Sequence, residues 1–249
     1  MMEIHEIAKV LKLPYIKSNY QLLLDEAAHT KMGHKELLQT FLENEYELRL
    51  ENGLRNRLRR AKFPTKKYLT DFDRSKYDKK FHSKFDELET LEFIEKKENI
   101  ILIGSPGCGK THYATALGIK ACMEGHKVLF ISVPNLIIEL KEAMSESRLN
   151  QYKRKFEKYS TVILDEMGYV SFDKAGSEIL FNLLSNRTDK GSIIITSNLS
   201  FDRWNEIFND QVLTGAIVDR LAYKSHILDI SRDVSHRFEE TISWLKADK

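Results

Sequence analysis

The sequence predicts an α/β protein with a mostly parallel sheet covered by helices on both faces, preceded by a small all-α bundle. Two observations lead to this fold class. From residue 100 onward, five short apolar runs alternate with segments of helical length and periodicity. Before residue 62, only the helical periodicity appears. Alternating strands and helices are typical of a parallel sheet whose crossover helices cover it.

The composition of the whole chain narrows the class further. With 249 residues, the chain is long enough for a core domain plus a smaller one, and its 42% hydrophobic residues can form a buried core. Charged residues make up 31%, and no apolar run approaches the length of a membrane span. The first 13 residues mix charges with Ile and Leu, unlike a secretory signal. We therefore expect a soluble, cytoplasmic protein with no membrane partner.

Three N-terminal segments have helical patterns. They cover residues 3–13, 20–28 and 35–61, and Pro14 ends the first. We expect an N-terminal helical domain over residues 1–66, a linker with short helices over 67–98, and the α/β domain over 99–249. In the linker, Phe72 is expected to act as a packing anchor, with stacking on a base as the less favoured interpretation.

A basic stretch runs from Arg49 to Lys67, and its only acid is Glu51. Clustered Lys and Arg gain affinity for DNA by releasing counterions from its phosphates, although such runs also occur as plain solvated faces. Both interpretations stay open, and the same holds for a basic triplet before the third apolar run. The candidate DNA contacts are Arg55, Arg59, Lys62, Lys153, Arg154 and Lys155.

The five apolar runs are the expected strands of the sheet. They cover residues 100–103, 128–132, 162–164, 193–196 and 227–230. In open parallel sheets, ligands bind at the carboxyl ends of the strands. The polar residues that directly follow each run are therefore the first candidates for a functional site.

A phosphate-binding loop follows the first run. It consists of Gly104, Ser105, Pro106, Gly107, Cys108, Gly109, Lys110 and Thr111, which match the pattern G-x-x-x-x-G-K-[ST] between an expected strand and an expected helix. Successive backbone N–H groups and the positive helix end surround a polyphosphate there. Lys110 is placed to reach the β- and γ-phosphates, and the Thr111 hydroxyl is placed to ligate Mg²⁺.

Two adjacent carboxylates end the third run. Asp165 is expected to hold Mg²⁺, and Glu166 to polarise the attacking water as a general base. Many strands end in acids for solubility, so the pair gains this meaning because a phosphate loop belongs to the same sheet. Asn198, after the fourth run, would orient the water with Glu166, or it is an ordinary turn residue.

Further motifs add to this pattern, and they extend over most of the chain. They are His112-Tyr113-Ala114 after the phosphate loop, Leu164 to Gly168, Thr196 to Asn198, Trp204, Phe208, Asp219 to Leu221, and Ser235 to Arg237. Together with the phosphate loop they are similar to the motifs of the IstB/DnaC-like AAA+ ATPases. The IstB branch, the transposition helper proteins of insertion sequences, is the closer match. The chain departs from the family at Cys108, where Thr or Ser is frequent, and at Arg232–Asp233, where Gly is often found.

The resemblance implies an AAA+ core that uses ATP and Mg²⁺, with His112 joining the phosphate loop in binding the nucleotide. Arg220 resembles the arginine finger that acts on the neighbouring subunit's nucleotide. Arg237 resembles the arginine that senses the γ-phosphate of its own subunit. A structural ion pair remains an alternative role for Arg220, and Arg187 or Arg232 remain alternative functional arginines.

By the same resemblance, the leading hypothesis is an ATPase that oligomerises with ATP on duplex DNA, with little sequence preference, and assists a transposase in selecting its target site. The N-terminal bundle would then contact other subunits and the transposase. The alternative is a DnaC-like helicase loader; the chain has no aromatic-rich platform for single strands, which weakens this reading. A small-molecule kinase would need an acceptor pocket and a lid, and neither is identifiable.

Overall fold

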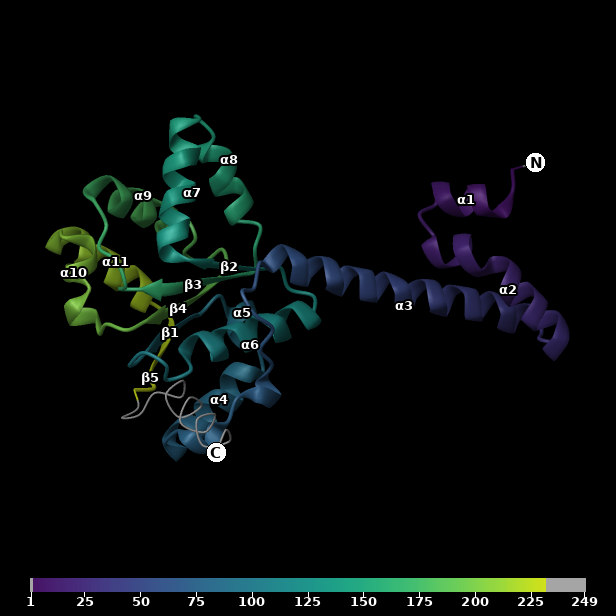
Figure 1. The fold of residues 1–249 in the computed structure, drawn as a ribbon, viewed down its shortest axis with the longest axis horizontal. Coiled ribbons are helices and arrows are strands. Elements are labelled where there is room, and N and C mark those ends of the chain that lie inside the picture. The colour runs from purple at the N-terminus through teal and green to yellow at the C-terminus, as the bar shows by residue number, and fades with distance from the viewer. Residues whose placement is uncertain (1, 232–249) are drawn as a thin grey trace, which may run out of the picture. The chain divides into compact units, whose positions relative to one another are not determined.

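A computed structural model describes residues 2–231 of the chain (Figure 1). The chain divides into two compact units, Met1–Asn56 and Arg57–Lys249. The division falls inside a long helix, α3, and it assigns residues 67–98, which we expected to form a linker, to the second unit. Within the described residues, no helix combines the length and apolar character needed to cross a bilayer.

The first unit is helical, as expected. It contains α1 (Ile4–Val10), α2 (Pro14–Thr30) and most of α3 (His34–Ala61). The nearly buried Glu45 joins α3 to α2, because its Oε2 accepts hydrogen bonds from the backbone N–H groups of Tyr15 and Ile16, at 2.9 and 3.1 Å. These N–H groups in the first turn of α2 have no partner within the helix.

The second unit is built on a five-stranded, all-parallel sheet in the order β2-β3-β4-β1-β5. The strands are β1 (Asn99–Ile103), β2 (Val128–Ser132), β3 (Thr161–Met167), β4 (Ser192–Ser197) and β5 (Ser225–Asp229). Every expected run therefore forms a strand, and the predicted α/β class is confirmed.

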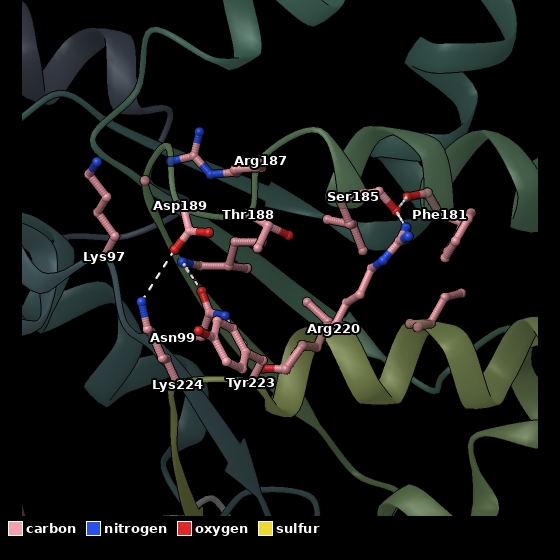
Figure 2. A pocket seen from close by; sticks show the side chains of 15 residues that line it. Lys97, Asn99, Phe181, Ser185, Arg187, Thr188, Asp189, Arg220, Tyr223 and Lys224 are labelled. Carbon is pink, nitrogen blue, oxygen red and sulfur yellow. Dashed lines mark hydrogen bonds and ion pairs between the residues drawn. The ribbon is translucent and has the colours of Figure 1, made fainter.

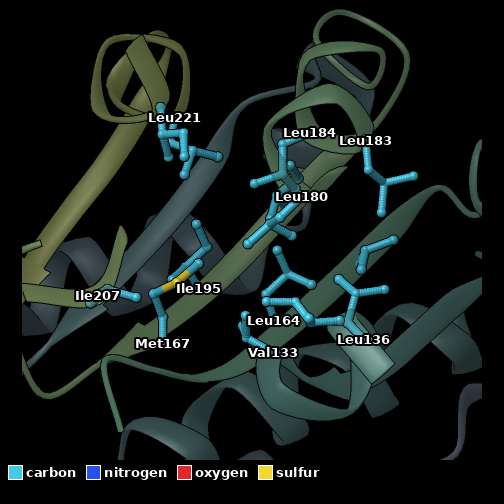
Figure 3. Close-up of a cluster of buried hydrophobic side chains, with 14 of the residues drawn as sticks. Val133, Leu136, Leu164, Met167, Leu180, Leu183, Leu184, Ile195, Ile207 and Leu221 are labelled. Atoms are coloured by element: carbon cyan, nitrogen blue, oxygen red, sulfur yellow. The ribbon is translucent and has the colours of Figure 1, made fainter. Parts of the chain in front are cut away.

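Helices cover both faces of this sheet (Figure 1). They are α6 (Lys110–Met123), α7 (Val133–Ser145), α8 (Leu149–Phe156), α9 (Lys174–Ser185), α10 (Asn205–Phe208) and α11 (Gln211–Ala222). On the face of α7 and α9, strand residues such as Leu164 and Ile195 pack with Leu136, Leu180 and Leu221 in one buried cluster (Figure 3). Alternate strand residues point to opposite faces, so the other half of each strand is left for α6.

The close approach of α6 to the sheet depends on Gly118. A Cβ at this position would lie 2.7 Å from Ile163 Cδ1 and 2.9 Å from the ring of Phe63. Real Cβ atoms do not come that close to other atoms, so the helix can pack here because Gly118 has no side chain. This contact fixes the middle of α6 against the sheet.

Residues 67–98 fold against α6. They form three short 3-10 helices, η1 (Leu69–Asp71), η2 (Arg74–Lys76) and η3 (Lys79–Phe81), followed by α4 (His82–Glu89) and α5 (Glu92–Lys96). Phe72 is buried, with its ring centroid 4.9 Å from both Tyr77 and Tyr113 and 5.5 Å from Phe85. The anchoring role expected for Phe72 is confirmed, because aromatic rings bury a large apolar area.

Candidate functional site

The phosphate loop joins β1 to α6, as the motif predicts. Gly109 has φ of +97°, and a Cβ there would lie 2.3 Å from the hydroxyl oxygen of Tyr77. That hydroxyl donates a hydrogen bond to the backbone carbonyl of Cys108, at 2.6 Å. Glycine is therefore required at 109 both by the backbone conformation and by the side chain of Tyr77.

Lys110 is buried and folds back onto the loop. Its Nζ donates to the carbonyl oxygens of Gly104 and Ser105, at 2.7 and 2.9 Å. The ammonium group thus sits inside the loop against neutral acceptors. Because an ammonium interacts more strongly with an anionic oxygen than with a carbonyl, a phosphate that enters the loop can replace these contacts.

At the carboxyl edge of the sheet, three side chains form one hydrogen-bonded group. The hydroxyls of Thr111 and Thr196 both donate to Asp165 Oδ1, at 2.8 and 2.5 Å, and Thr196 Oγ1 accepts from the backbone N–H of Glu166 at 3.1 Å. Thr196 was not among our candidates. Its position at the end of an expected strand was the available signal, and the strand order, with β4 between β3 and β1, is what brings it to Asp165.

Glu166 is placed by an irregularity of β3. The register between β3 and β4 shifts between Leu164 and Met167, and Glu166 has φ of +64°, which is unusual for a residue other than glycine. Such bulges change the direction of a side chain and store backbone strain at functional sites. Here Asp165 is buried and Glu166 is exposed, so two adjacent carboxylates have different surroundings.

A cavity of about 430 Å³ lies beside these groups. It is lined by Thr65, Lys66, Lys67, Asp71, Phe72, Asp73, Tyr77, Gly107, Gly109, Lys110, Thr111, His112, Thr115, Glu166, Tyr169 and Thr196. The structure therefore brings together the phosphate loop, His112 and Glu166, as predicted. It also adds Lys66 and Lys67, which we had assigned to the basic stretch, and the residues around Phe72.

Asn198 does not line this cavity. It follows β4 and is half-buried, and its Oδ1 is buried with no hydrogen-bond partner in the described part of the chain. A Cβ on Gly168 would lie 2.6 Å from this atom, so Asn198 is packed against the turn after β3.

Arg187 has a structural role. It is fully buried, and its guanidinium donates to the backbone carbonyls of Phe156, Tyr159 and Ser192, at 3.1, 2.7 and 3.2 Å. Burial lowers the pKa of Arg187 to about 10, although Glu157 nearby acts to raise it. A side chain held in this way cannot reach another subunit, so Arg187 is excluded as a finger. Arg232 and Arg237 lie outside the described residues.

Arg220 lies near the end of α11 and is exposed. It lines a second, smaller cavity that shares no residue with the cavity at the phosphate loop. Figure 2 shows its side chain extending toward α9, where it contacts Ser185 and the ring of Phe181. Arg220 and the phosphate loop of the same chain are therefore not brought together.

Five of the six candidate DNA contacts lie on two helices. Arg55 and Arg59 are exposed on α3, and Arg154 and Lys155 are exposed on α8, where Lys153 is half-buried. Lys62 follows the end of α3 and forms an ion pair with Glu139, at 3.4 Å. Lys62 and Lys155 line one small cavity, so the second unit brings these two lysines together.

Known proteins with similar sequences include ATP-binding proteins of insertion sequences. Residues 6–242 match the family described as IstB-like ATP binding protein. The ATP-binding protein of insertion sequence IS21 from Pseudomonas aeruginosa is 38% identical over 240 residues, which cover 96% of this chain and 90% of the relative. The corresponding protein of insertion sequence IS5376 from Geobacillus stearothermophilus is 34% identical, over 95% and 94% of the two chains.

Among solved structures, AMPPCP-bound DnaA from Aquifex aeolicus is similar with a TM-score of 0.59 and 18% identity, over 75% of this chain and 56% of that one. DnaI is similar with a TM-score of 0.56 and 20% identity, over 66% and 90%. At these identities the likeness shows a shared fold. Since the family match extends from the first helices to residue 242, the chain belongs to the IstB-like ATP-binding proteins, with an AAA+ P-loop fold.

Proposed function

We propose that this protein is a Mg²⁺-dependent ATPase that oligomerises on duplex DNA, without sequence preference, and assists a transposase in selecting its target site in the cytoplasm. One observation carries the proposal: Lys110, Thr111, Asp165 and Glu166 meet at one edge of the sheet, beside a cavity of about 430 Å³. The similarity to ATP-binding proteins of insertion sequences supports the transposition context.

The chemistry follows from the two environments of the carboxylates. The loop N–H groups and Lys110 bind the phosphates of ATP. The exposed Glu166 takes a proton from the attacking water as general base. Asn198 lies outside the cavity lining, and the role of orienting that water is proposed for it because its Oδ1 has no hydrogen-bond partner among the described residues. Thr111 and Asp165 supply the oxygen ligands that Mg²⁺ prefers, and one or two protein ligands with phosphate oxygens are its usual set. Held by Thr111 and Asp165, Mg²⁺ would supply charge neutralisation at the phosphates.

Arg220 acts in trans in this proposal. Its separation from the cavity of its own chain supports an action on the neighbouring subunit's nucleotide, where an arginine stabilises the charge of phosphoryl transfer. Arg237, outside the described residues, is proposed to sense the γ-phosphate in cis.

The helical N-terminal region, residues 1–66, is proposed to contact other subunits and the transposase, with residues 99–249 as the ATPase domain. Exposed apolar side chains in the first unit support a surface for a protein partner. They include Ile4, Ile7, Val10, Leu11, Leu38, Leu42, Tyr46 and Leu50. DNA phosphates are proposed to contact Arg55, Arg59, Lys62, Lys153, Arg154 and Lys155.

The first experiment measures the mass of the assembly on a nonspecific duplex of several helical turns, with ATP, with ADP and without nucleotide. On duplex DNA, we expect a large discrete particle with ATP but not with ADP or without nucleotide. Glu166→Gln should make this particle persist, because its ATP would not be hydrolysed. Lys110→Ala should abolish both the assembly and hydrolysis. A protein that stays small on duplex but binds single strands or a helicase hexamer would show that it is a helicase loader.

The DNA contacts are tested through the salt dependence of duplex affinity. Replacing Arg154 by Ala should lower the slope of log K against log [salt] by about 1, because one phosphate contact is lost. Lys96→Ala is the matched control, since Lys96 is an exposed cation that pairs with Glu92 on α5. Equal slopes for the wild type and Arg154→Ala would remove α8 from the DNA surface.

A further inference from the structure

The side chain of Arg220 is exposed and makes two contacts with α9. A long exposed arginine normally samples many rotamers, and ordering it costs conformational entropy. Here two groups on α9 hold the guanidinium: Ser185 accepts a hydrogen bond from Nη1, and the ring of Phe181 lies 4.5 Å from Cζ, in a cation–π contact. Figure 2 shows both contacts at the end of α9.

The Ser185 hydroxyl is itself oriented. It donates to the backbone carbonyl of Phe181, one turn earlier in α9, at 2.7 Å. Its proton is therefore engaged, and its lone pairs are left for the N–H of Arg220. The remaining guanidinium N–H groups of Arg220 have no hydrogen-bond partner among residues 2–231, so they stay available to an incoming anion.

Both groups that hold Arg220 are uncharged. The carboxylate that lines the same cavity, Asp189, pairs instead with Lys224, at 3.4 Å, on the other side in Figure 2. A carboxylate partner would neutralise the arginine and compete with phosphate for its N–H groups. Ser185 and Phe181 orient the guanidinium and leave its charge uncompensated, which suits a group that must stabilise charge on a phosphate.

We propose that Ser185 and Phe181 are positioning residues for Arg220, which they hold in the orientation in which it meets the neighbouring subunit's ATP. This inference rests on the proposed function, in which Arg220 is the trans finger. An arginine that is already ordered loses no further side-chain entropy when it contacts the phosphate. Preorganisation of Arg220 therefore raises the rate of hydrolysis.

The test is complementation between two inactive proteins. Glu166→Gln subunits lack the general base but carry an intact finger, and Arg220→Ala subunits carry an intact site but lack the finger. Mixed on duplex DNA with ATP, they should recover hydrolysis at sites of Arg220→Ala subunits that have a Glu166→Gln neighbour. If no activity is recovered, the assignment of Arg220 as trans finger fails, and this outcome is separate from the result for Ser185.

Ser185→Ala is then added to either partner. Placed on the Glu166→Gln finger donor, it should lower kcat of the mixture about tenfold, well below the roughly 10³-fold effect of losing a finger, with KM for ATP unchanged. Placed on the Arg220→Ala acceptor, it should change nothing. Equal effects on both partners, or none on the donor, would overturn the proposal.

Three variants separate positioning from folding. Ser185→Thr keeps the hydroxyl and should restore the rate of hydrolysis that Ser185→Ala loses. Phe181→Leu on the donor should lower kcat as Ser185→Ala does, although Ser185 itself is unchanged. Ser145→Ala is the matched control, because Ser145 ends α7, is exposed and bonds a carbonyl of its own helix, at 2.8 Å, with no arginine partner among the described residues. A loss of kcat in Ser145→Ala equal to that in Ser185→Ala would show a nonspecific effect.

Discussion

Replacing Thr196 by Val tests the hydrogen-bonded group at the edge of the sheet. Valine has nearly the shape of threonine, so the packing is kept and only the hydroxyl is lost. That hydroxyl donates to the buried Asp165 and accepts from Glu166 N–H. A hydrogen bond to a charged group contributes about 1.5–3 kcal/mol, and an orphaned N–H adds about 1 kcal/mol. We expect the free energy of unfolding to fall by about 2.5–4 kcal/mol.

The assay is urea unfolding of the nucleotide-free protein followed by tryptophan fluorescence, to which the buried Trp204 contributes. Thr161→Val is the matched control. Thr161 is also fully buried at one end of β3, but its hydroxyl has no partner among the described residues. Removing it should leave stability unchanged or raise it by up to about 1 kcal/mol, because an unpaired buried hydroxyl is costly.

The reasoning also predicts a loss of activity. Without Thr196, the backbone at Glu166 loses the contact that fixes its bulge, so kcat for ATP hydrolysis should fall together with stability. If Thr196→Val is as stable as Thr161→Val and hydrolyses ATP at the wild-type rate, the hydrogen-bonded group does not organise the site.

Three further outcomes are expected. Gly118→Ala should destabilise the protein by about 1–3 kcal/mol, because its Cβ would overlap Ile163. Gly215→Ala, in open space on α11, should instead stabilise the protein by about 0.5–1 kcal/mol. Urea unfolding compares the two variants, and equal shifts would contradict the packing argument. Arg187→Met should cost about 3 kcal/mol or more, because three carbonyls lose their donor, and a wild-type unfolding midpoint would refute this. Burial raises the pKa of Cys122 to about 11, so its thiol stays protonated at pH 8 and should react with iodoacetamide, as measured by peptide mass, only after unfolding.

Local patterns were enough to predict the strands, and the candidate phosphate loop and carboxylates that directly follow them. The phosphate loop is contiguous in the chain, and its glycines, Lys110 and Thr111 have roles that depend on neighbouring residues alone. The same is true of Asp165 and Glu166 at the end of a buried run. Periodicity and spacing therefore placed all five strands and the contiguous groups of the candidate site.

Contacts between distant segments could not be predicted in this way. The strand order β2-β3-β4-β1-β5 places β4 between β3 and β1, which brings Thr196 to Asp165. The expected linker supplies Lys67 and Phe72 to the cavity, next to Lys66 from the preceding segment, because an aromatic cluster folds the linker onto α6.

The two arginines illustrate what the sequence determined and what only the tertiary structure decided. In the sequence, Arg187 and Arg220 were both candidates for the finger, since their charge is the same. In the structure, Arg187 is enclosed by carbonyls, and Arg220 is exposed on α11 beside Ser185 and Phe181. Residue type determined that each side chain carries a guanidinium. Burial decided which of the two remains accessible to a second molecule, and burial depends on how the helices pack on the sheet.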